Sequence, residues 1–293
     1  MSNIILKDEF NFSKDDVIKT KAHQQTLWKK TRIIGGYDKY VDKYGISKLG
    51  EVIFDEENIV PMGGVQYAME KIFNVAGPSD ITNVIGYLND QGIGSQNYST
   101  NDSPYPVGHC VCLWGLGLGG AAENGYTVLD LKYRDTEIPE MIPFRYTNET
   151  LEEEEENQYF GKKMVSNNGE DRKAYFLKTF EGEPVIRHQW KSGELDVDGP
   201  ELTGETFVTD STNEIESYTE IELKIKPTEL KEWFDLKYKI EEVRFNTLAL
   251  YTGVYDPNEN DYGMIKMFSR LNIPTEHLAL LKDLTILYRV YGA

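Results

Sequence analysis

The residues closest in type and spacing to a metal site lie near the C-terminus, in "DPNENDYGMIKM", which begins at Asp256. Asp256, Asn258 and Asn260 occupy positions 1, 3 and 5, where a calcium loop places oxygen ligands. Position 6 is Asp261 instead of Gly, and position 12 is a Met instead of a bidentate Glu. Asp and Asn also stabilise turns by bonding their own backbone. We therefore predict a hairpin turn, with a divalent cation on Asp256, Asn258 and Asn260 as the alternative.

A second acidic pair, Asp196 and Asp198, stands in "GELDVDGPE". Two carboxylates that face one cleft can act as the acid and the base or nucleophile of a glycoside hydrolase. Carboxylates at this spacing can also hold a divalent cation. Because a Gly-Pro sequence follows at once, the pattern favours two solvated side chains on a turn.

Both cysteines of the chain, Cys110 and Cys112, follow His109 in "GHCVC". A structural zinc site needs four ligands, and a disulfide between neighbours i and i+2 of a strand is strained. A Cys nucleophile with a His base is the chemical alternative. We predict two free thiols that act as small core residues in a reducing compartment.

The elements that carry these residues are predicted from hydrophobic periodicity. We expect a mainly β chain with a few short helices, of the α+β class, with an antiparallel β-sandwich or barrel-like core. In the strand at 218–226 the inner side chains should be Tyr218, Ile221, Leu223 and Ile225. The other predicted elements are strands at 107–118, 126–135, 238–253, 264–273 and 284–292, a hairpin of 174–180 with 184–190, and helices at 61–77 and 228–236, the latter with Thr228 as N-cap.

Composition restricts the class of partner. The formal net charge is −18, from 49 acidic and 31 basic residues. This charge argues against binding to nucleic acid and to an anionic membrane surface. The longest apolar stretch, residues 110–122, is rich in Gly and shorter than a membrane span. With no visible signal peptide, we expect the protein to be made in the cytoplasm.

Two regions are expected along the chain. Residues 1–50 are predicted to form an extended N-terminal arm, and the alternative is that they pack on their own domain. Residues 51–293 are predicted to form a β-rich assembly domain with a long, loop-rich, acidic middle section. The run "EEEEE" at 152–156 should be a solvated loop, because like charges repel one another.

Two segments together resemble a family. One is "ENIVPMGGVQYAMEKIFNV" (57–75), a short strand, a Gly pair and an amphipathic helix. The other, at 246–292, contains "NTLALYTG" and "MIKMFSRLNIP" and closes on an aromatic, β-branched strand. The ordered pair resembles virion structural proteins of tailed bacteriophages, mostly tail, neck or baseplate components. It covers about a quarter of the chain and contains no catalytic signature.

The resemblance implies a non-enzymatic structural component of the tail, baseplate or neck, without a cofactor and located in the virion. Its partners would be other virion proteins or copies of itself in a ring or another symmetric assembly. Sheet edges and arms can pair across subunits. The residues expected at these contacts are Trp28, Ile33, Tyr37, Tyr40, Tyr251, Tyr255 and Tyr262.

Two other function classes remain open from the sequence. A fibre-attachment or carbohydrate-binding module would stack Tyr and Trp rings on sugars, and exposure of Trp114 or Trp190 would favour it. A glycan hydrolase would use Asp196 and Asp198 across one cleft.

Overall fold

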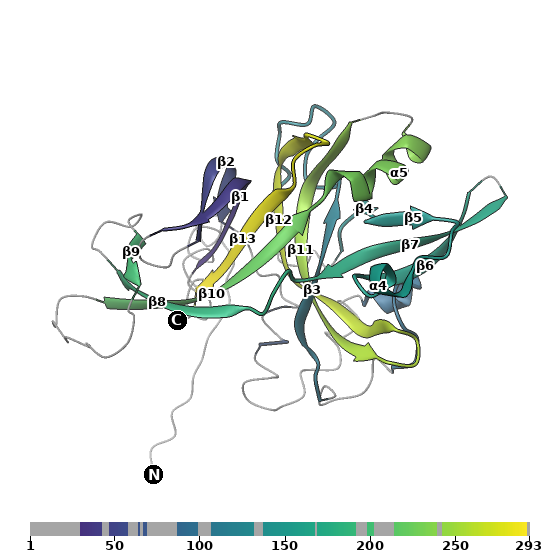
Figure 1. Ribbon diagram of the computed structural model, residues 1–293, viewed down its shortest axis with the longest axis horizontal. Coiled ribbons are helices and arrows are strands. Elements are labelled where there is room, and N and C mark those ends of the chain that lie inside the picture. Colours follow the sequence, from purple (N-terminus) through teal and green to yellow (C-terminus); the bar gives the residue numbers. More distant parts are fainter. Residues whose placement is uncertain are drawn as a thin grey trace, which may run out of the picture.

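The fold is taken from a computed structural model of the chain (Figure 1). For Lys30 and for residues 187–191, 198–201 and 214–217 the backbone alone is described. The described residues are 30–42, 47–57, 64, 67, 68, 87–98, 107–131, 137–167, 169–191, 198–201, 214–238 and 242–291.

Two antiparallel sheets make up most of the molecule, so the mainly β prediction is confirmed. The first sheet has the order β2-β1-β13-β10-β8-β9. The second has the order β12-β11-β3-β7-β5, with β4 paired to β3 and β6 paired to β7. The strands are β1 (Lys30–Val41), β2 (Ser47–Glu57), β3 (Cys110–Gly117), β4 (Met141–Ile142), β5 (Arg145–Thr147), β6 (Tyr159–Asn167), β7 (Glu170–Thr179), β8 (Val185–Lys191), β9 (Asp198–Glu201), β10 (Glu214–Ile225), β11 (Val243–Asp256), β12 (Asp261–Leu278) and β13 (Leu284–Tyr291).

The main core lies between the two sheets. Ile221 and Tyr288 from the first sheet belong to the same buried cluster as Trp114 and Phe245 from the second. A buried hydrogen bond between the hydroxyl groups of Ser269 on β12 and Tyr288 on β13 also joins the sheets. Burial of each such large side chain contributes about 1.5–3 kcal/mol relative to leaving it exposed.

Few helices accompany the sheets. The principal one, α5 (Pro227–Lys237), buries Leu230 and Phe234 in the core and lies beside β4 and β5 (Figure 1). Its N-cap is Lys226 and its first helical residue is Pro227, so the prediction of Thr228 as N-cap is wrong. Pro suits this position because its missing N–H would have no partner there. The short elements are η1 (Leu88–Gln91) and α4 (Glu153–Glu156), and Gly64, Tyr67 and Ala68 are helical within the predicted helix at 61–77.

A sharp bend in β1 folds the β1–β2 hairpin back over the first sheet. Arg289 on β13 is paired with Arg32 on β1 in the strand register. The guanidinium of Arg289 nevertheless donates to the carbonyl oxygen of Ser47, and Ser47 is paired with Val41 at the far end of β1. A straight strand would separate positions 32 and 41 by about 30 Å. The register is interrupted between Gly35 and Gly36, so the bend is placed there.

Strand pairing corrects the prediction of an N-terminal arm for residues 30–41 and 47–50. β1 lies between β13 and β2 in the first sheet, and residues 47–50 belong to β2. For these residues the alternative holds, namely that they pack on their own domain. Residues 1–29, with Trp28, lie outside the described part of the chain.

Three further predictions about elements need correction. Segments 174–180 and 184–190 do not form a hairpin, because β7 belongs to the second sheet and β8 to the first. Residues 126–131 form an exposed loop instead of the predicted strand, with an isolated bridge from Ala121 to Val128. Most of the "EEEEE" run forms helix α4.

The remaining strand predictions are confirmed. The buried strand at 107–118 is β3, and the three closing strands are β11, β12 and β13. In β10 the predicted inner side chains Ile221, Leu223 and Ile225 face the main core, as predicted, whereas Tyr218 is buried on the opposite face, against Arg289.

Candidate functional site

The turn between β11 and β12 is a hairpin connection, as predicted, and protein groups hold its acidic side chains. Asp256 is buried and its Oδ2 accepts hydrogen bonds from Ser95 Oγ and Asn97 Nδ2, each at 2.7 Å. Its Oδ1 accepts from the Asn258 backbone N–H at 3.0 Å. These donors, Ser95 foremost, lower the pKa of Asp256. The carboxylate therefore joins the turn to the segment around Ser95.

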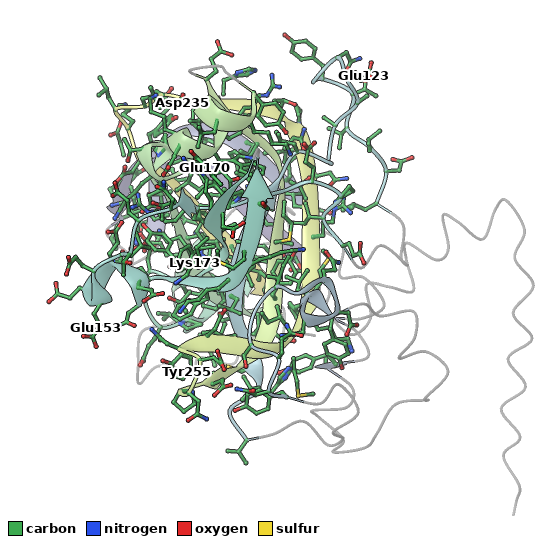
Figure 2. The ribbon with its side chains drawn as sticks, turned by 90° about the vertical axis from the view of Figure 1, so that its right-hand side faces the viewer. Glu123, Glu153, Glu170, Lys173, Asp235 and Tyr255 are labelled. Atoms are coloured by element: carbon green, nitrogen blue, oxygen red, sulfur yellow. The ribbon has the colours of Figure 1, made fainter. Side chains whose placement is uncertain are left out.

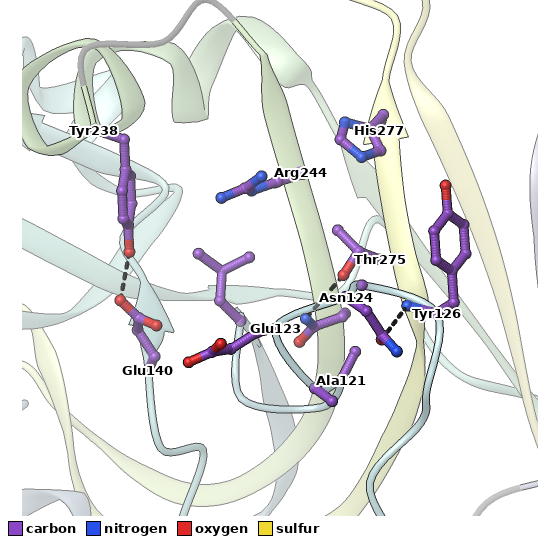
Figure 3. Close-up of a pocket in the computed structure, with 13 residues that line it drawn as sticks. Ala121, Glu123, Asn124, Tyr126, Glu140, Tyr238, Arg244, Thr275 and His277 are labelled. Atoms are coloured by element: carbon purple, nitrogen blue, oxygen red, sulfur yellow. Dashed lines mark hydrogen bonds between the residues drawn. The ribbon is translucent and has the colours of Figure 1, made fainter.

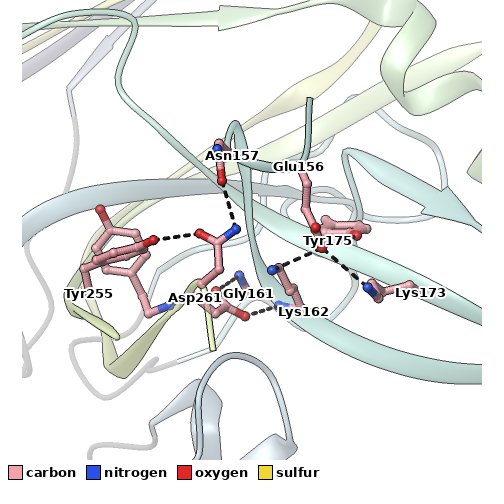
Figure 4. Close-up of polar contacts among 10 residues, drawn as sticks. Glu156, Asn157, Gly161, Lys162, Lys173, Tyr175, Tyr255 and Asp261 are labelled. Carbon is pink, nitrogen blue, oxygen red and sulfur yellow. Dashed lines mark hydrogen bonds and ion pairs between the residues drawn. The ribbon is translucent and has the colours of Figure 1, made fainter. Parts of the chain in front are cut away.

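Asn260, the third residue of the predicted cation set, is also engaged by protein groups (Figure 4). Its side-chain oxygen accepts from the Tyr255 hydroxyl at 2.7 Å, and its Nδ2 donates to Asn157 Oδ1 at 2.8 Å. In the ranges described here, no three His, Cys, Asp or Glu side chains are grouped as ligands of a metal ion.

Asp261 connects the same hairpin to β6 (Figure 4). Its carboxylate accepts the backbone N–H groups of Gly161, Lys162 and Tyr262 at 2.7, 2.8 and 2.8 Å. Burial raises the pKa of Asp261, while these three N–H donors oppose the rise. Asp261 therefore has a structural role at the start of β6.

Some of the residues predicted to contact partners are buried in the protein and others are exposed. Ile33, Tyr37 and Tyr251 are buried in the protein's own core, so the prediction that they form a contact surface needs correction. Tyr40 and Tyr255 are 50% and 43% exposed, and Tyr262 is partly buried. Tyr40 lies in the first sheet and Tyr255 in the second.

The contacts of His109 and the two cysteines bear on the alternative of a Cys nucleophile with a His base. Cys110 and Cys112 are free thiols, as predicted, but Cys110 is exposed and Cys112 is only partly buried, so the prediction that both act as small core residues is wrong. A hydrogen bond with Cys110 and burial raise the pKa of Cys112, which disfavours the reactive thiolate. The buried His109 instead places its Nε2 at 3.0 Å from the carbonyl oxygen of Met264.

Two predicted alternatives rest on residues that the structure describes only in part. Asp198 begins β9 and pairs with Lys191, but its side chain and the whole of Asp196 lie outside the described residues. The hydrolase alternative stays a prediction. Trp114 is buried and donates its Nε1–H to the carbonyl oxygen of Thr179 at 3.0 Å, so its ring is not available to a sugar. The side chain of Trp190 is likewise not described.

A polar pocket of about 450 Å³ lies at the other end of the β11–β12 hairpin, far from the turn (Figure 3). Figure 2 shows the two ends, with Tyr255 beside the turn and Glu123 on the loop that borders the pocket. Arg244 on β11 and His277 on β12 are partners in the strand register, so both side chains project to one face. Val243 and Phe245, on either side of Arg244 in the chain, point into the core.

The loop at residues 120–129 forms one wall of the pocket. The side chain of Asn124 accepts the backbone N–H groups of Tyr126 and Thr127 at 3.0 Å each. Gly125, with φ +74°, supplies the left-handed turn residue. The backbone N–H of Thr275 on β12 donates to the Gly125 carbonyl oxygen at 2.7 Å, which fixes the loop along this edge strand.

The opposite wall carries a charged network. Glu140 accepts hydrogen bonds from the Tyr238 hydroxyl and from Lys237 Nζ, the latter at 3.1 Å. Although burial opposes it, these hydrogen bonds and the nearby charges of Lys237 and Arg244 lower the pKa of Glu140. Glu140 is therefore an ionised hydrogen-bond acceptor at neutral pH.

Sequence patterns did not single out this pocket, because its walls come from separate segments. Two signals were present. The Asn124-Gly125 pair is a hairpin-turn signal, and "VRFN" at 243–246 alternates apolar with polar residues. Neither pattern shows that the loop and the strand meet.

No protein family, curated protein or solved structure that was compared with the chain matches it. Within the described ranges, no helix has both the length and the apolar character needed to cross a membrane.

Proposed function

We propose that the protein is a non-enzymatic structural component of a tailed-phage virion that assembles by protein–protein contacts in the tail, baseplate or neck. The position in a virion rests on the resemblance of residues 57–75 and 246–292 to such proteins. The role in contacts rests on an observation about strand β8.

At its start β8 is apolar and exposed on both faces. Val185 and Ile186 are consecutive, so their side chains point to opposite faces of the strand. Both are exposed, Ile186 at 69%. Two consecutive apolar residues exposed on the two faces of a strand suit a contact with another protein chain.

The same strand continues into a ribbon that leaves the body of the sheet. β10 pairs with β13 only as far as Tyr218, whereas residues 214–217 of β10 pair with residues 188–191 of β8. Figure 1 shows β8 and β9 extending to one side. This extension consists of short parts of β10, β8 and β9, so docking on a neighbouring subunit or another virion protein would stabilise it.

An incorporation assay tests the proposal. Purified particles would be probed by immunoblot for the wild-type chain, for Ile186→Asp and for the control Leu281→Asp, in a turn residue that is 99% exposed. We expect the wild type and the control in particles and an at least about tenfold loss of Ile186→Asp, because a buried unpaired charge is costly. Absence of the wild-type chain from particles would overturn the proposal. Equal incorporation of Ile186→Asp would remove β8 as the contact.

A further inference from the structure

We propose that the pocket beside Arg244 binds a neutral saccharide. This binding function is separate from assembly through β8, since the pocket is formed by β11, β12, α5 and the loop at 120–129. Figure 3 shows Arg244 between Tyr238 on one side and Tyr126 on the other, with Glu123 and Glu140 below it.

The pocket presents hydrogen-bonding groups that the described residues leave unused. Arg244 has an electrostatic attraction to Glu140 but no hydrogen bond within the described part of the chain. Both protein donors to Glu140 use Oε1, which leaves Oε2 able to accept. Thr275 Oγ1 accepts from Asn246 Nδ2 at 3.2 Å and keeps its own proton to donate. The set therefore contains donors and acceptors side by side, as neighbouring sugar hydroxyl groups require.

An aromatic ring stands at the rim of this polar set. Tyr126 is 84% exposed, and the hydrogen bonds from its backbone and from Thr127 to Asn124 fix the turn that carries it. A Tyr ring offers an apolar face with a polar tip, and the C–H groups on one face of a pyranose ring can pack on it. A pocket of about 450 Å³ has room for one or two sugar rings.

Charge decides between a neutral and an acidic saccharide. The pocket is lined by Glu123 and Glu140, and Glu242 lies 3.2 Å from His277 at its edge. The whole chain carries a net charge of −18. This field repels an anionic ligand, whereas a neutral saccharide can use the carboxylates as acceptors without that penalty.

Ligand-observed NMR with the full chain tests the inference. The probes would be glucose, galactose, mannose, N-acetylglucosamine and their disaccharides, with glucuronate as the acidic comparison. We expect saturation transfer to at least one neutral probe. Its Kd should rise by about fivefold in Tyr126→Ala and by about tenfold in Arg244→Gln, with Tyr40→Ala as a matched control on an exposed Tyr outside the pocket, which should leave Kd unchanged.

Three outcomes would overturn the inference. The first is that no neutral probe binds to the folded wild-type chain. The second is that a neutral probe binds but its Kd is the same in Tyr126→Ala and in the wild type, since this exposed side chain can be removed without disturbing the fold. The third is that glucuronate alone binds, which would show that the pocket selects acidic ligands.

Discussion

At the residue scale, the two acidic side chains at the ends of the β11–β12 turn serve as structural hydrogen-bond acceptors. Asp256 and Asp261 face each other across the β11–β12 hairpin, and each accepts three donors from the protein. The spacing of Asp256, Asn258 and Asn260 suggested both a turn and a cation site, because Asp and Asn serve both purposes. The hydrogen bonds of Asp256 agree with the turn.

Acid titration tests the role of Asp256. Its pKa in the folded protein is below the ordinary value of 3.8, so its stabilising effect is present above that value and is lost as the pH falls through the lower, folded pKa. We expect Asp256→Asn to lower the free energy of unfolding at pH 7, and the difference from wild type to shrink below pH 4. Urea unfolding from pH 7 to pH 2 measures it. A difference that stays constant over this range would contradict the assignment.

Asp261 should give the opposite dependence of stability on pH. Its folded pKa is raised, so its contribution is largest below the ordinary value of 3.8 and declines as the pH rises through the folded pKa. The stability of the wild type relative to Asp261→Asn should therefore fall as the pH rises from 3 to 6. The same urea series checks this second prediction, and a relative stability that rises with pH would refute it.

Tyr251 offers a stabilising substitution. Its hydroxyl is buried and has no hydrogen-bond partner among the described residues. Because an unsatisfied buried hydroxyl costs about 1–3 kcal/mol, Tyr251→Phe should raise the free energy of unfolding by about 1 kcal/mol or more. The control Tyr175→Phe removes a hydrogen bond to Glu156 and should lower it. Thermal or urea unfolding of both variants would decide, and a loss of stability in Tyr251→Phe would count against the prediction.

At the element scale, two glycines determine how the first sheet is covered. A Cβ at Gly36 would lie 2.0 Å from the Glu51 carbonyl oxygen, and one at Gly35 would lie 2.2 Å from the Phe54 ring. The bend at these residues places the β1–β2 hairpin over Arg289, whose Nε donates to Glu220 at 3.0 Å in a buried ion pair. The hairpin therefore shields a charge pair that would be costly to leave buried without its partners.

Substitution at the bend tests this role. Gly36→Ala should lower the free energy of unfolding by about 1–3 kcal/mol, because the methyl group collides with backbone that cannot rotate away. Gly182→Ala is the matched control, since no atom lies within 4 Å of its added Cβ. Urea unfolding compares the two. Equal stability of both variants would show that the bend is not fixed by Gly36.

The sequence predicted the individual strands better than it predicted which strands pair with one another. Alternation in "YTEIELKIK" correctly placed Ile221, Leu223 and Ile225 on the core face of β10, because that face depends on local period. Tyr218 lies on the opposite face, which the β1–β2 hairpin covers, and the local pattern did not show this. The short connection "EGE" suggested a hairpin, yet residues before and after it belong to different sheets. Strand pairing depends on contacts between distant segments, and no local pattern records them. The pocket was missed for the same reason, as Tyr126, Glu140 and Arg244 come from separate segments.

At the scale of the whole molecule, the surface is acidic and the exposed apolar groups occur in a few places. Glu153 and Glu170 are exposed, and Figure 2 shows Glu153 at the edge of the molecule. A net charge of −18 favours repulsion between free copies, so the proposed function expects contacts at exposed apolar residues such as Val185 and Ile186 of β8. This combination suits a chain that stays separate until it meets its place in an assembly.

Electron microscopy of intact particles tests the central claim most directly. An antibody fragment against the purified chain would be bound to particles, with an unrelated fragment as the control. The proposed function predicts label at one defined level of the tail, baseplate or neck, in a symmetric arrangement. Particles that are complete but carry no specific label, or label only on detached host material, would contradict a virion role.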